Sequence, residues 1–184
     1  SRDIGPGNCL IDSWVRKNSK KKFDKDGLLA LTGKRNEIVF NQAEELFSSI
    51  ARRKTQSLDI NDFDVSFARG LSLEDGAATL TDFTGKIIGT SLLTHLSSIN
   101  SPLLKVLVCG GGRKNKRLIE NIKKSTLKNL QIKPIDDYGV NGDFVESQAF
   151  AYLAIRSILK MPISFPKTTG CRQPCTGGEI IKIK

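Results

Sequence analysis

Apolar residues recur at helical spacing in the first third of the chain. Four such side chains in residues 9–17 fall on one face of a helix: Leu10, Ile11, Trp14 and Val15. Asn8 stands just before them, where an N-cap residue belongs. Residues 41–54 repeat the amphipathic pattern. We therefore predict one helix in each of these two stretches.

A long apolar segment further on predicts a buried helix. Ser72 is a suitable N-cap residue, and apolar and small residues fill most of positions 77–96. Gly85 and Gly89 interrupt this stretch. Because glycine weakens a helix interior, the pattern fits either one long helix or two shorter ones.

The helix predicted for residues 143–159 has a strong start signal. Asp143 and Glu146 stand at the spacing of a capping box, in which two side chains satisfy free N–H groups of the first turn. Candidates for its packed face are Phe144, Ala151, Ala154, Ile155 and Ile158. From Pro162 onward the chain is rich in Pro, Thr and Gly, so we expect irregular structure there.

The clearest supersecondary signal lies between these two helices. A strand-like apolar run, residues 103–108, leads through Cys109 into Gly110–Gly112. A helical pattern follows over residues 113–124, and a second strand is predicted at residues 131–135. Strand, glycine turn, helix and strand make a βαβ unit, so the predicted fold class is α/β.

Composition narrows the classes of function. The chain has 184 residues with 39% hydrophobic and 26% charged residues, which are values of a folded domain. Its net charge of +10 favours an acidic partner such as a nucleotide, a nucleic acid or a phosphorylated product. Aromatic residues are only 7% and do not interleave with the basic clusters, which makes nucleic-acid binding the weakest of these hypotheses.

Two further expectations concern metals and location. Of the four cysteines only Cys171 and Cys175 are close together, and without further ligands nearby we predict no metal site. No stretch approaches the roughly 18 apolar residues of a membrane helix. We therefore expect a cytoplasmic protein that does not associate with a membrane. Because the chain starts at Ser1 without an initiator Met, we also expect a fragment or a processed product.

Gly110, Gly111 and Gly112 are the first candidates for chemistry. Backbone N–H groups at a turn between strand and helix are free to meet a phosphate, and glycine lets a flat base approach the backbone. The turn lacks both the ending of a P-loop and the third spaced glycine of a dinucleotide fingerprint. A nucleotide site and a purely structural turn both fit this pattern.

Two carboxylates also have alternative interpretations. Asp3 lies on a tight loop with Gly5 and Gly7, where it could act as a general base in a cleft. It could equally cap the amides of its own loop. Glu146 fits a ligand for a substrate near the start of its helix, or the partner of Asp143 in a capping box.

Taken in order, these motifs resemble those of the anhydro-N-acetylmuramic acid kinases. Five segments carry the likeness: a DTGPGN-like loop at residues 3–8, an ATLT helix at 78–81, a VCGGGxxN motif at 108–115, a DxxEAxAFAxLA-like helix at 143–154 and a TTG…GG loop at 168–178. The likeness covers nearly the whole chain. One such motif would be weak, whereas the ordered set is specific.

The resemblance implies a fold and a reaction. The fold is that of sugar kinases and actin-like ATPases, with lobes of RNase H-like topology in which helices flank a mixed sheet. The reaction uses ATP and Mg²⁺ to cleave the 1,6-anhydro bond of anhydro-N-acetylmuramic acid and phosphorylate the released oxygen. The product, N-acetylmuramic acid 6-phosphate, belongs to peptidoglycan recycling, and the family suggests a homodimer.

The resemblance also assigns roles to residues of this chain. Asp3 becomes the catalytic base that takes a proton from water. The sugar is assigned to Gly5, Gly7, Asn8 and Glu146. The nucleotide is assigned to Gly110, Gly111, Gly112 and Asn115.

Two departures from the family pattern qualify this expectation. Arg113 and Lys114 replace the small residue and the His that commonly follow the glycines, which affects the expected nucleotide contacts. The amino-terminal half of the family, with its glycine-rich phosphate loop, has no counterpart here. We therefore interpret residues 1–184 as the carboxyl-terminal portion of a two-lobed kinase, inactive without the missing half as partner. The alternative is a non-catalytic remnant or a nucleotide-binding module of the same fold.

Overall fold

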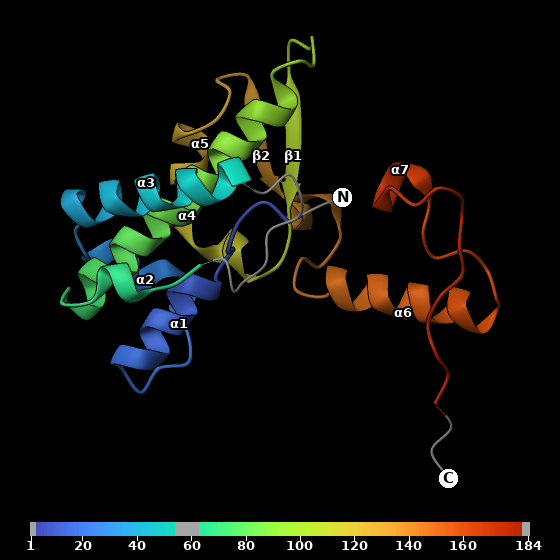
Figure 1. The fold of residues 1–184 in the computed structure, drawn as a ribbon, viewed down its shortest axis with the longest axis horizontal. Coiled ribbons are helices and arrows are strands. Elements are labelled where there is room, and N and C mark those ends of the chain that lie inside the picture. Colours follow the sequence, from blue (N-terminus) through green and yellow to red (C-terminus); the bar gives the residue numbers. More distant parts are fainter. Residues whose placement is uncertain (1–2, 54–62, 182–184) are drawn as a thin grey trace.

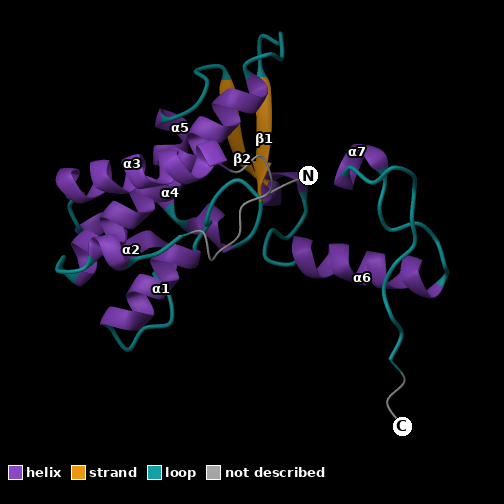
Figure 2. Cartoon of the chain, viewed as in Figure 1, coloured by secondary structure: helices purple, strands orange, loops and turns teal. Residues whose placement is uncertain are grey.

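The computed structural model of the protein describes residues 3–53 and 63–181, with the backbone alone at residues 49–53. Seven α-helices and two strands occur in these residues (Figures 1 and 2). The helices are α1 Cys9–Asn18, α2 Leu28–Thr32, α3 Glu37–Arg53, α4 Leu73–Leu96, α5 Lys116–Lys124, α6 Val145–Ile158 and α7 Pro166–Thr169. The strands are β1 Leu104–Val108 and β2 Leu130–Pro134.

Helix α1 confirms the predicted amphipathic face. Its four apolar side chains are all buried in the larger core cluster, among residues of α2, α3 and α4: Leu10, Ile11, Trp14 and Val15. The Trp14 indole N–H donates to the carbonyl oxygen of Leu73 at 2.9 Å, which ties α1 to the start of α4. The capping prediction is wrong: Asn8 occupies the N-cap position, but its backbone is helical and its side chain makes no capping bond.

Helix α3 begins four residues earlier than predicted. The side-chain oxygen of Asn36 accepts a hydrogen bond from the Val39 N–H at 3.0 Å, which caps the helix at Glu37. The first turn then brings Phe40 and Ala43 into the core beside α4. Asn36, a polar residue that lies outside the apolar pattern, therefore sets the start of α3.

Helix α4 is one continuous helix of 24 residues, and Ser72 caps it as predicted, accepting from the Asp75 N–H. The two glycines that interrupt the pattern let α5 approach closely. A Cβ placed at Gly85 would lie 2.6 Å from the Asn121 Cβ, and one at Gly89 would lie 2.8 Å from the Ile122 carbonyl oxygen. The glycines therefore serve helix packing and do not break the helix.

Strands β1 and β2 pair in parallel, with Leu104 opposite Leu130 and Val108 opposite Pro134. Helix α5 connects them, which confirms the βαβ unit and the α/β class. The expected mixed sheet is a parallel pair within residues 3–53 and 63–181. Helix α5 starts three residues later than predicted, because Gly111–Lys114 forms a 3-10 turn and the Asn115 side chain caps Lys116 onward.

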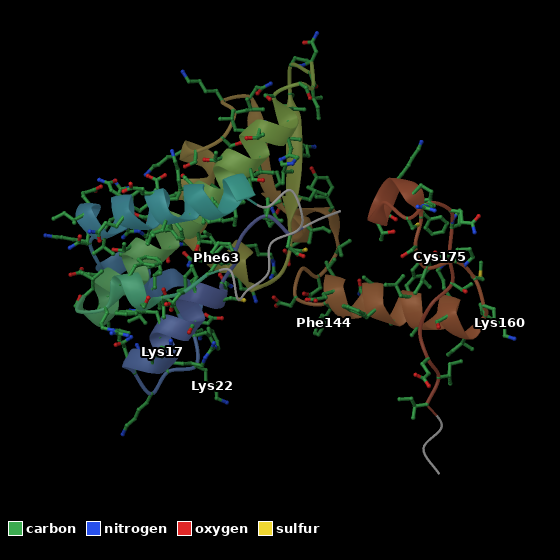
Figure 3. All side chains as sticks on the ribbon, in the orientation of Figure 1. Lys17, Lys22, Phe63, Phe144, Lys160 and Cys175 are labelled. Atoms are coloured by element: carbon green, nitrogen blue, oxygen red, sulfur yellow. The ribbon has the colours of Figure 1, made fainter. Side chains whose placement is uncertain are left out.

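Helix α6 contradicts two predictions. Asp143 and Glu146 form no capping box, because Phe144 takes the N-cap position and no side chain caps the helix. The expected packed face is also wrong, since no residue of α6 is buried. Figure 3 labels Phe144 and Lys160 near the two ends of this helix. In Figure 1, α6 and α7 extend away from the other helices.

After α6 the chain is largely irregular, as predicted, apart from α7 and one antiparallel bridge between Ser164 and Cys175. A smaller core cluster lies between α5 and the sheet, with Leu118, Ile122, Leu130 and Ile132 buried. Among the described residues, no helix combines the length and apolar character that crossing a membrane requires.

Candidate functional site

The carboxyl ends of β1 and β2 meet at the glycine turn. Gly110 has a φ of +73°, a conformation that favours glycine, and its N–H donates to the Gly142 carbonyl oxygen at 2.8 Å. Among the described residues, apart from its two chain neighbours, no atom lies within 4 Å of where a Cβ of Gly110 would stand. In parallel α/β sheets, ligands bind outside the carboxyl ends of the strands. The turn is therefore open to a ligand on the side of the sheet where one is expected.

The Asn8 side chain joins the first loop to this turn. A Cβ placed at Gly111 would lie 3.4 Å from Asn8 Nδ2, and one at Gly112 would lie 3.5 Å from Asn8 Oδ1. The loop carrying Asp3, Gly5 and Gly7 therefore lies beside the glycine turn, although about one hundred residues separate them in sequence. Two motifs that the sequence singled out separately share one place in the structure.

Within the first loop, two glycines have different surroundings. Gly7 has a φ of +54° and open space where a Cβ would stand. Gly5 packs against α4, where a Cβ would lie 3.1 Å from the Ile87 Cγ2. Asp3 is exposed on the same loop. The loop is thus anchored on α4 through Gly5, and its Asp3 is exposed.

Arg113 ties the glycine turn to the segments that follow β2. Its guanidinium donates to both carboxylate oxygens of Asp136, at 2.7 and 2.9 Å, and to Asp143 at 2.5 Å. It also donates to the Gly110 carbonyl oxygen at 2.9 Å. The Arg113 side chain is only 6% exposed. This arrangement, which we call the Arg113 clamp (Arg113, Asp136 and Asp143), fixes the chain entering α6 against the turn.

The clamp shifts the ionisation of its members. Hydrogen bonds from Arg113 hold the pKa of the Asp136 carboxyl well below its ordinary range. Hydrogen bonds from Arg113, and then from Lys114, likewise lower the pKa of Asp143. Bonding to Asp136 and then Asp143 raises the pKa of Arg113. All three groups stay charged at neutral pH, so the ion pairs of Arg113 with Asp136 and Asp143 persist under physiological conditions.

Comparisons with known proteins decide the family. The family model of anhydro-N-acetylmuramic acid kinase matches residues 1–182. A protein of that name from Pelagibacter ubique (strain HTCC1062) is 52% identical over 182 residues, which are 99% of this chain and 48% of that protein. Another from Zymomonas mobilis is 40% identical over 180 residues, 97% of this chain and 47% of that protein.

This chain belongs to the anhydro-N-acetylmuramic acid kinase family. It spans about half the length of the curated relatives it matches. The family assignment explains why the DIGPGN loop and the glycine turn occur together, because both are motifs by which the sequence resembles these kinases. The residue assignments that the resemblance suggests remain predictions, and the structure adds the environment of each.

Arg113 and Lys114, which replace the residues that commonly follow the glycines in the family, both bind Asp143. Lys114 Nζ lies 2.7 Å from Asp143 Oδ2. Both side chains therefore have a carboxylate partner within this chain. The expected effect of these two residues on nucleotide contacts stays a prediction.

Glu146 and Asn115 have contrasting environments. Glu146 is exposed on the first turn of α6, three residues beyond Asp143 in the clamp. The Asn115 side chain is buried, and its oxygen accepts from the Leu118 N–H at 3.0 Å to cap α5. Gly27 packs directly against it. Asn115 therefore has a structural role at the start of α5, whatever it contributes to nucleotide binding.

The groups at the glycine turn fit a nucleotide better than a metal ion that protein side chains alone would hold. The open glycine turn gives a flat base or a phosphate access to the backbone. Among the described residues, no cluster of three or more His, Cys, Asp or Glu side chains could hold a metal ion. Mg²⁺ in phosphoryl-transfer sites is typically held by one or two carboxylates together with substrate phosphates. A Mg²⁺ ion held largely by nucleotide phosphates would not require such a cluster.

Asp136 and Gly142, at the carboxyl ends of the strands, were not predicted from the sequence. Both follow β2, and residues that follow neighbouring parallel strands gather at the same end of a sheet. Gly142 is buried, and Arg113 leaves no room for a side chain there, since a Cβ would lie 2.5 Å from Arg113 Nε. The position of Asp136, two residues after the end of β2, is a signal in the sequence that could identify it.

A second polar cluster lies away from the site and was also missed. Asp82 of α4 is buried and accepts from Arg117 Nε at 2.7 Å and from Asn121 Nδ2 at 2.6 Å. An open cavity of about 620 Å³ lies beside it, lined mainly by charged side chains. Arg117 also donates to the Gly33 carbonyl oxygen at 2.9 Å, so the cluster joins α2, α4 and α5. Its role is to hold the helices together.

Proposed function

We propose that this chain is the carboxyl-terminal portion of a two-lobed kinase with the sugar kinase and actin-like ATPase fold. The whole protein uses ATP to cleave the 1,6-anhydro bond of anhydro-N-acetylmuramic acid and to phosphorylate it to N-acetylmuramic acid 6-phosphate. The contact of Asn8 with Gly111 and Gly112 carries this proposal, because it brings the sugar loop beside the nucleotide turn. The relatives bearing that kinase's name support it.

In this proposal Asp3 is the general base. Its carboxylate accepts a proton from a water molecule as the water oxygen bonds to the anomeric carbon of the sugar. The bond from that carbon to the bridging oxygen breaks, and this oxygen bonds to the γ-phosphorus of ATP as the bond to the β-phosphate breaks and ADP leaves. Exposure of Asp3 on a loop anchored against α4 supports the role, since a base must reach the substrate from a fixed support.

The other site residues position the two substrates. Gly5 and Gly7 let the backbone approach the sugar, and Asn8 and Glu146 bind its polar groups by hydrogen bonds. The open turn at Gly110–Gly112 receives the adenosine side of ATP. Mg²⁺, when bound with the phosphates, neutralises charge that phosphoryl transfer develops. In the proposal the whole protein works in the cytoplasm as a homodimer.

The test measures ATP-dependent phosphorylation of anhydro-N-acetylmuramic acid. This chain is co-expressed with the part of the Pelagibacter ubique relative that it does not cover, and the purified pair is assayed. Asp3→Asn is expected to reduce kcat by about 10²–10⁴-fold, since it removes general-base catalysis. Asp26→Asn is the matched control, because Asp26 is exposed with a φ of +55°, a conformation that asparagine adopts readily.

Two outcomes would contradict the proposal. Turnover that survives Asp3→Asn unchanged removes the assigned base. A folded pair that binds ADP without turning over the sugar favours the alternative, a nucleotide-binding remnant of the same fold. The Arg113 clamp is the observation behind that alternative, because it takes up the two residues that depart from the family pattern.

A further inference from the structure

Helix α6 presents a large apolar surface that the rest of the described chain leaves uncovered. None of its residues is buried. Six large apolar side chains on it and at its ends are each more than half exposed: Phe144 56%, Phe150 64%, Tyr152 58%, Ile155 57%, Ile158 62% and Leu159 61%. We call α6 together with Phe144 and Leu159 the apolar arm. Contiguous apolar surface of this kind marks an interaction site in soluble proteins.

The apolar surface extends over more than one face of the helix. Tyr152, Ile155 and Leu159 recur at spacings of three and four residues and share one face. Phe150 lies five residues before Ile155, which places it about 140° away around the helix axis. A helix that is apolar on most sides is typical of a protein interior, whereas a surface helix keeps one apolar stripe. The apolar arm therefore has the character of a helix that is buried in its complete protein.

Both ends of the apolar arm are fixed to the chain. At its start, Asp143 is held in the Arg113 clamp. Near its end, Arg156 Nε donates to the Pro162 carbonyl oxygen at 2.6 Å, and Ser157 Oγ donates to the Gly177 carbonyl oxygen at 2.6 Å. The arm thus leaves the sheet at the edge where the candidate site lies (Figure 1). Anything that covers the arm also lies near that site.

We infer that the apolar arm is the docking surface for the part of the protein that this chain does not cover. That part corresponds to about half the length of the relatives, so it is large enough to bury the arm. Docking there faces it toward the Asp3 loop and the glycine turn, which completes the cleft. The inference rests on the proposed function for the identity of this partner.

A lipid membrane is a poorer occupant of the same surface. Fourteen residues of helix rise about 21 Å, which is shorter than the roughly 30 Å hydrocarbon core of a bilayer. The arm also carries Glu146 and Arg156 on a helix otherwise rich in apolar residues. A protein surface can pair such charges and cover several faces at once, as the interior of a domain does.

Capture of this chain tests the inference. The uncovered part of the Pelagibacter ubique relative is tagged and co-expressed with this chain, and the chain retained on the tag is quantified. Ile155→Asp combined with Ile158→Asp is expected to lower the retained amount at least about tenfold, because each substitution places a charge where an aliphatic side chain would be buried against the partner. Ile38→Asp is the control, since Ile38 is 72% exposed on α3, away from the arm.

Three results would overturn the inference. One is equal retention of the double variant and the unsubstituted chain, and another is no retention of the unsubstituted chain by the soluble tagged partner. The third is self-association of this chain, seen by light scattering, that the double substitution abolishes and the tagged partner does not displace. In that case a second copy of this chain occupies the arm.

A second measurement covers the case of a partner that is insoluble on its own. The same part of the relative is joined to Ser1 in one polypeptide, and amide hydrogen exchange of α6 is compared with that in this chain alone. Slower exchange over Val145–Ile158 is expected, and unchanged exchange contradicts the inference. Neither measurement depends on turnover, so a complex that forms without activity supports docking and refutes only the proposed function.

Discussion

Helices α4 and α6 are both rich in apolar residues, yet they differ completely in burial. Twelve of the 24 residues of α4 are buried, among α1, α2, α3 and α5. None of the 14 residues of α6 is buried. Apolar character is a property of the sequence, whereas burial also needs a partner surface. Helix α4 finds that surface within this chain, and we propose that α6 finds it in the rest of the protein.

The largest expected contrast comes from truncating one apolar side chain in each helix. Leu80→Ala in α4 is expected to cost about 2–5 kcal/mol, because it leaves a cavity in a fully buried site. Ile158→Ala in α6 is expected to change the free energy of unfolding by less than about 0.5 kcal/mol. Urea unfolding followed by the fluorescence of the buried Trp14 measures both. Equal costs would refute the contrast.

A smaller effect is expected from the close approach of α4 and α5. In an open helix, replacing glycine by alanine stabilises by about 0.8–1 kcal/mol. Gly89→Ala is instead expected to destabilise by about 1–3 kcal/mol, because the new Cβ meets the Ile122 carbonyl oxygen at 2.8 Å. The exposed neighbour Thr90→Ala serves as control. A stabilised Gly89→Ala variant in thermal unfolding would show that the helices are further apart.

Two asparagines at N-cap positions give the next contrast. Asn115→Ala is expected to cost about 0.5–2 kcal/mol, because its side chain caps α5 from a buried position. Asn8→Ala is expected to change stability by less than about 0.5 kcal/mol, since its side chain makes no capping bond. Denaturant midpoints of the two variants would be compared with that of the parent chain. A larger loss for Asn8→Ala would contradict the structure.

The smallest effect is expected from the Arg113 clamp and depends on pH. The folded-state pKa of Asp136 and Asp143 is lowered, so their contribution to stability is complete above the ordinary aspartate pKa of about 3.9 and is lost as pH falls below it. Both carboxylates are about two-fifths exposed, so solvent weakens the effect. The urea midpoint of the parent should therefore fall more steeply below about pH 4 than that of Arg113→Met. Parallel pH profiles would show that the clamp adds no stability.

Much of the fold formed by α1 to α5 and the two strands could be predicted from local sequence pattern. The apolar face of α1, the cap at Ser72 and the βαβ unit follow from spacing within a few residues, and the structure confirms each. These features depend on contacts that the chain makes with itself. Local pattern and packing then indicate the same structure.

The two wrong capping predictions share a physical cause, because in each case the polar side chain interacts with a distant segment and not with its own helix. Asp143 fits a capping box but binds Arg113 and Lys114, which are about thirty residues away in sequence. Asn8 fits an N-cap but lies against Gly111 and Gly112. Such long-range competition for polar groups leaves no trace in the spacing of neighbouring residues.

The candidate site was predicted in pieces and assembled only by the structure. Asp3 and the glycine turn were singled out separately, and their proximity through Asn8 required the fold. The exposed face of α6 could not be predicted, because the same sequence pattern describes a helix buried in this chain and one buried against another segment. We therefore attribute the difference in burial between α4 and α6 to a partner surface outside this chain.

We propose that this chain supplies part of a kinase active site and needs the rest of the protein to complete it. The most direct measurement titrates this chain against a fixed amount of the uncovered part of the Pelagibacter ubique relative while N-acetylmuramic acid 6-phosphate is quantified. We expect no product from either part alone, and turnover that rises with added chain and saturates at equal amounts. A complex that forms in equal amounts but yields no product from ATP and anhydro-N-acetylmuramic acid would contradict it.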